Sequence, residues 1–159
     1  MNVIKKNYVS LMVWIFSLIL IGFIIGTLTK SSVDAWYAPL NRSHLTPPNY
    51  LFGIVWSILY TTIGTSGWMI WRSNYFSELS VIKKLYSIQL FLNWSWTPLF
   101  FIYHLTSIAL ICLFLIVTVV AFIIFKTYRP LTTVSLLFIP YLFWLLFATY
   151  LNYYIWRYN

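Results

Sequence analysis

The chain has 159 residues, of which 62% are hydrophobic and 8% are charged, whereas a soluble domain carries roughly 25% charged residues. This composition excludes an ordinary soluble domain and indicates one membrane domain over residues 1–159. The formal net charge of +8 would suggest nucleic acid for a soluble protein. In a membrane protein it is explained by basic loops, so we expect no nucleic-acid partner.

Long uncharged runs lie between the few charged residues. They cover 7–29, 43–71, 85–125 and 131–156. About 20 helical residues cross a hydrocarbon core of about 30 Å, so the run 85–125, interrupted near its middle by His104, holds two spans. We therefore predict an all-α integral membrane bundle of five transmembrane helices, with a long capping loop between the first two.

Basic residues are concentrated on one side of this predicted bundle, at the N-terminus and in the second and fourth loops. They are Lys5, Lys6, Arg72, Lys83, Lys84, Lys126 and Arg129. Because cytoplasmic loops are rich in Lys and Arg, we predict a multi-pass protein with a cytoplasmic N-terminus. The bacterial cell membrane is the expected location, with the bacterial and mitochondrial outer membranes as alternatives.

The first helix is expected over residues 8–28 and contains Gly22 and Gly26, a spacing that lets another helix approach closely. The neighbour can belong to the same bundle or to a second copy in a homodimer, and both remain open. The loop expected next, 29–48, contains three prolines, which limit helix. Its Trp36 and Tyr37 indicate order, because disordered segments are poor in aromatic residues.

The second helix is expected from residue 48 or 49 to residue 71. Aromatic and small residues recur on one broad face of it, at Phe52, Trp56, Tyr60, Gly64 and Gly67. Trp68 and Trp71 lie near its end beside a charged residue, which is typical of an interfacial aromatic belt.

The third helix is expected over 81–103 and is the most polar. Gln89 and Asn93 must face the bundle interior, because unpaired amides are costly in hydrocarbon. They can serve as interhelical hydrogen-bonding groups or as a pocket wall, and the sequence supports both interpretations equally. Pro98 is expected to kink the helix.

The fourth helix, 106–125, is uniformly aliphatic, and we predict a lipid-facing scaffold. The fifth is expected over 131–156. Its aromatic, small and amide residues recur at steps of four, and we expect this stripe to face inward. The stripe is Pro140, Trp144, Ala148, Asn152 and Trp156.

No formal charge lies inside any predicted span, which excludes carboxylate pairs and Schiff-base lysines there. We assign no catalytic residue and expect no metal site, because His44 and His104 lack carboxylate or thiol neighbours. An axial haem ligand from either histidine stays open. Nine Trp, thirteen Tyr and thirteen Phe favour a flat, largely apolar ligand.

Several segments, in chain order, carry a family resemblance: Trp36-Tyr-Ala-Pro-Leu40, Thr46-Pro-Pro-Asn49, Phe52-Gly-Ile-Val-Trp56, Gln89-Leu-Phe-Leu-Asn93, Pro140-Tyr-Leu-Phe-Trp144 and Leu151-Asn-Tyr-Tyr-Ile-Trp156. With them the sequence resembles the TspO/MBR family of tryptophan-rich sensory proteins, translocator proteins and peripheral benzodiazepine receptors. The resemblance implies a five-helix bundle, often dimeric, with a pocket capped by the first loop. It also implies binding of porphyrins and other tetrapyrroles and, in some members, of cholesterol and benzodiazepine-type drugs.

The resemblance further implies residue roles. Trp56 and Trp144 correspond to paired pocket tryptophans that are also implicated in light-dependent porphyrin breakdown. The implied ligand-binding residues are Tyr37, Trp56, Asn93, Trp144 and Ala148, and the implied lid residues are Trp36, Pro47 and Pro48.

Two local features qualify the resemblance. Arg42-Ser43 stands where many relatives have Lys-Pro, which we expect to loosen the lid. Leu151, Tyr153 and Arg157 fit a cholesterol-motif pattern, which leaves a sterol partner open.

We therefore expect a membrane receptor or carrier for porphyrins, with a sensory or regulatory role, that requires no cofactor and takes porphyrin or haem as its ligand. One alternative is an enzyme that degrades porphyrin in light and oxygen through Trp56 and Trp144. A second alternative is a dimeric membrane scaffold or regulator.

Overall fold

The computed structural model describes the backbone of residues 2–73 and 78–159, and within these ranges the side chains from residue 8 onward. This part of the chain is helical and contains no strand. Its elements are α1 (Asn2–Ser32), the π-helical turn η1 (Val33–Tyr37), α2 (Asn49–Arg72), α3 (Leu79–Phe101), α4 (Thr106–Thr127) and α5 (Thr132–Tyr158). The predicted all-α bundle of five membrane-spanning helices is confirmed.

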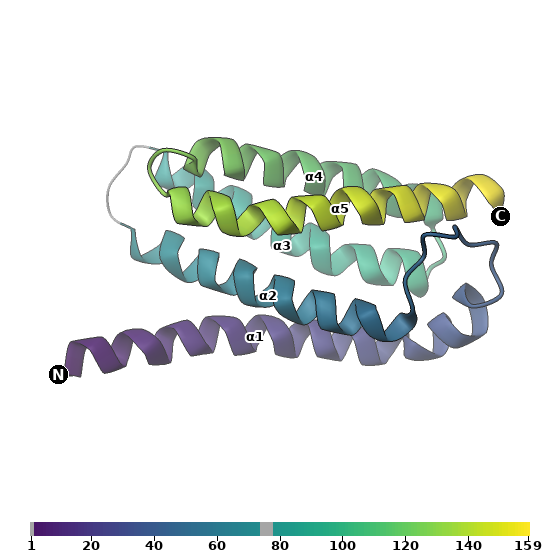
Figure 1. Ribbon diagram of the computed structural model, residues 1–159, viewed down its shortest axis with the longest axis horizontal. Helices are drawn as coiled ribbons and strands as arrows, with labels where there is room; N and C mark the ends of the chain where they lie inside the picture. Colours follow the sequence, from purple (N-terminus) through teal and green to yellow (C-terminus); the bar gives the residue numbers. More distant parts are fainter. Residues whose placement is uncertain (1, 74–77) are drawn as a thin grey trace.

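The helices run along the long axis of the molecule (Figure 1). α1 lies on the outer side of the bundle and packs mainly on α2, whereas α4 packs on both α3 and α5. The segments Tyr8–Tyr37, Thr106–Thr127 and Thr132–Tyr158 are by themselves long and apolar enough to cross a membrane.

The two ends of the bundle differ in charge. The N-terminus, the end of α2, the start of α3 and the α4–α5 turn lie at one end (Figure 1). The predicted concentration of basic residues at one end therefore holds in space. Glu78, beside α3, forms an ion pair of 3.0 Å with Lys126 of α4 at this end. That this end faces the cytoplasm stays a prediction.

The first helix is longer than predicted, because α1 continues to Ser32 and η1 carries the helical path on to Tyr37. The prediction that the loop begins at residue 29 is wrong, and the connection covers 38–48. A helix of 31 residues rises about 1.5 Å per residue and so extends beyond a core of about 30 Å. Lys30 therefore does not end the helix.

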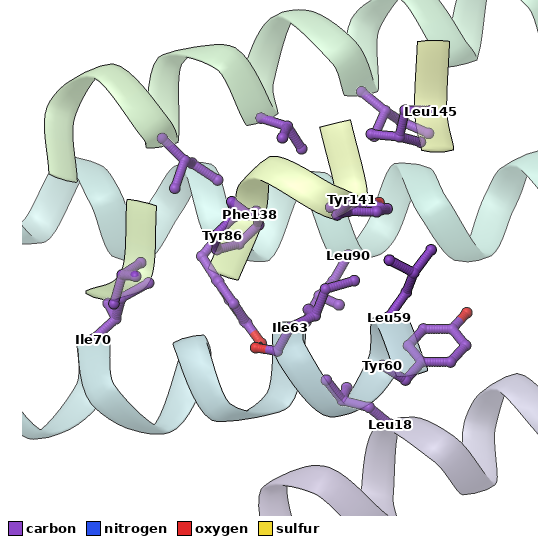
Figure 2. Close-up of a cluster of buried hydrophobic side chains, with 14 of the residues drawn as sticks. Leu18, Leu59, Tyr60, Ile63, Ile70, Tyr86, Leu90, Phe138, Tyr141 and Leu145 are labelled. Carbon is purple, nitrogen blue, oxygen red and sulfur yellow. The ribbon is translucent and has the colours of Figure 1, made fainter. Parts of the chain in front are cut away.

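The main core lies between α2, α3, α4 and α5, with Leu18 of α1 at its edge (Figure 2). Tyr86 is fully buried, and its hydroxyl donates a 2.9 Å hydrogen bond to the Ile63 carbonyl. Gly67 makes room for this ring, because a Cβ there would collide with Tyr86 and Trp14.

α1 and α2 approach closely at small residues of α2. A Cβ on Gly64 would lie 3.1 Å from the Cα of Ile15. In the Gly22/Gly26 pair, a Cβ on Gly22 would collide with the Tyr60 ring, whereas one on Gly26 would meet open space. Gly22 therefore packs within the bundle, which is one of its two predicted alternatives.

The prediction that α4 is only a lipid-facing scaffold is wrong, because one of its faces is part of the core. Its buried residues are Ala109, Leu110, Cys112, Leu113, Ile116, Val120, Ile123 and Thr127. The aliphatic residues on its other faces are exposed. A uniformly apolar helix gives no periodic signal that distinguishes its two faces.

The predicted inward stripe of α5 is correct only in its middle. Pro140 and Trp156, its first and last members, are exposed. Successive steps of four residues advance 40° beyond a full turn, so four such steps rotate away from one face. The buried face alternates steps of three and four instead, through Phe138, Tyr141, Leu145, Ala148 and Asn152.

Candidate functional site

A hydrogen-bonded network of side chains joins α2, α3 and α5 in the interior. The Tyr60 hydroxyl donates to Asn93 Oδ1 at 3.0 Å, and Asn93 Nδ2 donates to the Tyr141 hydroxyl at 2.8 Å. The Tyr141 hydroxyl in turn donates to Gln89 Oε1 at 3.2 Å. Asn93 is 3% exposed and Gln89 0%, so the prediction that both amides face inward is confirmed.

The network leaves polar capacity unused. Gln89 Nε2 is buried and has no hydrogen-bond partner among the described residues. Asn93 uses one N–H and one lone pair of its amide, and each of these two groups can make a second bond. A buried donor without a partner costs free energy, so a ligand that brings an acceptor gains by meeting it.

Aromatic rings surround this network. The Trp56 ring lies 5.4 Å from the Tyr60 ring, tilted by 34°, and 6.4 Å from the Tyr141 ring in an edge-on contact. These distances lie within the range of favourable ring pairs. The two tyrosines that hold Asn93 by hydrogen bonds therefore also contact Trp56 with their rings.

Trp144 lies against the same core from α5. Its ring contacts Phe52 of α2 at 5.8 Å and Phe147 at 5.7 Å. Ala148, one turn further along α5, is buried in that core. Three of the five implied ligand-binding residues, Trp56, Trp144 and Ala148, thus belong to or pack against one cluster. A fourth, Asn93, is hydrogen-bonded to Tyr60 and Tyr141 of that cluster.

Tyr37 lies in a second, neighbouring cluster. It is buried against Phe100 and Phe101, with ring centroids 6.0 and 5.5 Å away. Trp96 and Leu99 of α3 pack against both clusters and so connect them. Trp96 also donates a 3.1 Å hydrogen bond to Asn152, which fixes α3 to α5 at this level.

The implied lid residue Trp36 is held by the α3–α4 turn. Its ring stacks on His104 at 4.1 Å and 17°. Ser32 is hydrogen-bonded to the Phe101 carbonyl and lies 3.1 Å from His104 Nε2. His104 has a positive φ of 56°, a conformation that non-glycine residues adopt infrequently. The α3–α4 turn is therefore held against the end of the α1–η1 segment.

The connection 38–48 is anchored to α5. Asn41 and Asn159 exchange two hydrogen bonds, from the Asn41 N–H to the Asn159 side chain at 2.8 Å and back to the Asn41 carbonyl at 3.1 Å. The buried Ser43 lies within 2.9 Å of the Tyr150 hydroxyl. Arg42-Ser43 was expected to loosen the lid. Ser43 instead supplies a hydroxyl group that bonds to α5, which a proline at this position cannot do. Pro47 is half-buried and Pro48 precedes α2.

The remaining tryptophans of α2 lie near the charged end. Trp71 is 40% exposed, and Lys83 Nζ lies 5.8 Å from its ring. The Arg72 guanidinium lies 4.9 Å from the Trp68 ring. Trp68 Nε1 is buried and has no hydrogen-bond partner among the described residues. The interfacial role of both tryptophans stays a prediction.

Sequence comparison with known proteins identifies the family of this chain. The family model described as the TspO/MBR family matches residues 11–157. The chain belongs to the TspO/MBR family. It is 35% identical to the tryptophan-rich protein TspO of Archaeoglobus fulgidus over 153 residues, 96% of this chain and 99% of that protein. It is also 37% identical to the translocator protein of Homo sapiens over 126 residues, 78% of this chain and 75% of that protein.

In this TspO/MBR chain, sequence reasoning missed the two hydroxyls that organise the site. Tyr60 was placed on the correct face of α2 but was given no role, and Tyr141 was passed over beside Pro140. Their signal is a tyrosine at the level of an intramembrane amide, since a buried Tyr hydroxyl usually has a hydrogen-bond partner. The implied ligand-binding residues line neither of two surface grooves of about 480 and 770 Å³. The candidate site therefore rests on the network and its surrounding rings.

Proposed function

We propose that this chain is a membrane receptor or carrier that binds porphyrins, haem among them, and related flat apolar ligands, with a sensory or regulatory role. The observation that carries the proposal is the arrangement of Trp56 and two tyrosines around Asn93. Tyr60 and Tyr141 contact the Trp56 ring and hydrogen-bond the Asn93 amide at once. This combination offers stacking surface and directional polar groups within one bundle.

The chemistry of a tetrapyrrole complements such a site. Its flat ring gains from offset or edge-on contacts with Trp56 and Trp144, each worth about 1 kcal/mol beyond buried area. Its polar substituents supply acceptors for the unused N–H of Asn93 and for Gln89 Nε2. Trp36, Pro47 and Pro48 then act as the lid at the end of the bundle where the connection 38–48 is anchored.

The test uses the purified protein in nanodiscs, titrated with protoporphyrin IX and followed by the shift of the porphyrin Soret band. This readout does not depend on the fluorescence of the tryptophans that are changed. We expect Trp56→Phe with Trp144→Phe to raise Kd about tenfold or more, because two ring contacts are weakened.

The matched control is Trp68→Phe with Trp71→Phe, which changes the same number of the same residue near the charged end. It should leave Kd unchanged. An unaltered Kd in the first double variant, or an equal rise in the control, would exclude the proposed site. Titrating haem and a sterol against the same variants shows which flat ligand depends on Trp56 and Trp144.

A second candidate is degradation of the bound porphyrin in light and oxygen. The observation that favours it is the run of oxidisable rings formed by Trp56, Tyr60 and Tyr141. Illumination in the presence of oxygen should then remove the Soret band only when Trp56 and Trp144 are present. Equal bleaching in the double variant, or of porphyrin in detergent alone, would refute enzymatic degradation while leaving binding intact.

A further inference from the structure

A groove of about 770 Å³ lies at the α4–α5 turn, and none of the residues of the proposed tetrapyrrole site lines it. Its lining combines charged and polar residues with apolar ones. They are Glu78, Ala121, Ile124, Phe125, Lys126, Tyr128, Arg129, Pro130 and Leu142. It contains neither the tryptophans nor the amides of the network, so it is a separate feature of the molecule.

The rim of the groove is positively charged. Lys126 is paired with Glu78 at 3.0 Å, which leaves the exposed Arg129 beside it. The chain has one other acidic residue, Asp34, and it lies in η1 at the opposite end. Glu78 is engaged by Lys126, and among the described residues Arg129 forms no ion pair. An arginine side chain presents several N–H donors in a planar fork that matches phosphate oxygens.

The apolar wall leads from this rim toward the middle of the bundle. Phe125 is 74% exposed on α4, and Leu142 lies ten residues beyond the start of α5 at Thr132. At a rise of about 1.5 Å per residue, the wall reaches roughly 15 Å along α5. This depth is about half of the hydrocarbon core, which corresponds to one leaflet.

We propose that this groove binds an anionic phospholipid. Arg129 holds the phosphate at the membrane surface, and the exposed Tyr128 contacts the headgroup region. One acyl chain follows Phe125 and Leu142 into the leaflet. Each feature alone has an ordinary explanation in a membrane protein, since basic loops occur without a groove and exposed apolar helix faces occur without a nearby cation. Here the basic rim lies at the depth of a lipid headgroup and the apolar wall lies at the depth of an acyl chain. This combination favours an anionic phospholipid as the occupant.

The test measures which lipids stay bound. The full chain is placed in phosphatidylcholine nanodiscs containing a minor fraction of phosphatidylglycerol, and the lipids retained on release are counted by native mass spectrometry. Arg129→Gln should reduce phosphatidylglycerol retention at least about fivefold and leave phosphatidylcholine retention unchanged. The matched control is Lys84→Gln, which removes the same charge at the same end outside the groove, and it should reduce retention by less than about twofold.

A second pair of variants tests the apolar wall. Phe125→Ala should also lower phosphatidylglycerol retention, whereas Phe122→Ala, exposed on the same helix outside the groove, should not. Both side chains face outward, so neither change is expected to disturb folding.

Three results would overturn the proposal. Equal losses in Arg129→Gln and Lys84→Gln would show diffuse attraction to the charged end. Displacement of the lipid by inorganic phosphate alone, with no effect of Phe125→Ala, would show a simple anion site. Competition by protoporphyrin IX that is lost in Arg129→Gln would assign the groove to the tetrapyrrole.

Discussion

Two aromatic clusters on α2 are built from the same residue types and differ in what their hydroxyls do. The Trp56 cluster contains Trp56, Tyr60 and Tyr141. The Trp71 cluster contains Trp71, Trp14 and Tyr86, with ring centroids 5.2 to 6.0 Å apart. In both, a tryptophan contacts a tyrosine from α3 or α5, so ring chemistry alone does not distinguish them.

The hydrogen bonds distinguish them. In the Trp71 cluster, the Tyr86 hydroxyl bonds the Ile63 carbonyl, which fixes α3 to α2. In the Trp56 cluster, the hydroxyls bond the side-chain amide of Asn93, which retains further donor and acceptor capacity. One cluster therefore holds helices together, whereas the other can also recognise a ligand. Each of the following changes tests this division.

The largest expected effect is at Gly67, under the Trp71 cluster. Gly67→Leu would drive its side chain into Tyr86 and Trp14 and break the bond to Ile63. We expect a loss of about 3 kcal/mol in the free energy of unfolding, measured by denaturant titration in detergent micelles. Gly53→Leu, which enters open space on the same helix, is the control. Similar stabilities of the two variants would show that the Trp71 cluster does not clamp the helices.

The next effect is at Asn93. Asn93→Leu removes the acceptor of Tyr60 and the donor to Tyr141, so buried hydroxyls lose partners on two other helices. We expect a loss of about 2 kcal/mol in the same unfolding assay. Thr118→Val, which removes a hydroxyl bonded within its own helix on the exposed face of α4, should change stability by less than about 0.5 kcal/mol. An unchanged stability of Asn93→Leu would mean that the network is not a structural unit.

Much of the difference between the Trp56 cluster and the Trp71 cluster was predictable from residue type and spacing. Gln89 and Asn93 had to face inward because hydrocarbon offers amides no partner. The shared face of Trp56, Tyr60 and Gly67 followed from helical periodicity. These inferences need only one helix at a time, and the helix limits beyond α1 agree within a few residues.

The features that could not be predicted from the sequence depend on contacts between several helices. The choice of Tyr60 as the neighbour of Gly22, and the burial of one face of a uniformly aliphatic α4, are set by how neighbouring helices pack. The extension of α1 to Ser32 was missed because a charge was taken as the end of the helix. Helix ends are set by capping and chain breaks, while charge marks the membrane boundary.

A smaller effect is expected on ligand binding from single tryptophan changes. Trp56→Phe should raise the Kd for protoporphyrin IX about fivefold, corresponding to about 1 kcal/mol of stacking. Trp71→Phe should leave it unaltered, because its neighbour Tyr86 directs its hydroxyl to the backbone. A Kd that rises in Trp71→Phe would remove the distinction between the two clusters.

The smallest expected effect on stability is at Gln89, although this residue is fully buried. Gln89→Met keeps the approximate volume and loses the bond from Tyr141, and such interhelical bonds are worth about 0.6 kcal/mol on average. It also removes the buried Nε2, which has no partner among the described residues. The two contributions oppose each other, so the unfolding free energy should change by less than about 1 kcal/mol.

The same variant should raise the Kd for protoporphyrin IX, because the free amide donor is lost. A loss of stability near that of Asn93→Leu, with an unchanged Kd, would show that Gln89 is structural. Unchanged stability with weaker binding would mean that the unpartnered amide is kept for the ligand, at the edge of a network whose other members also hold the helices together.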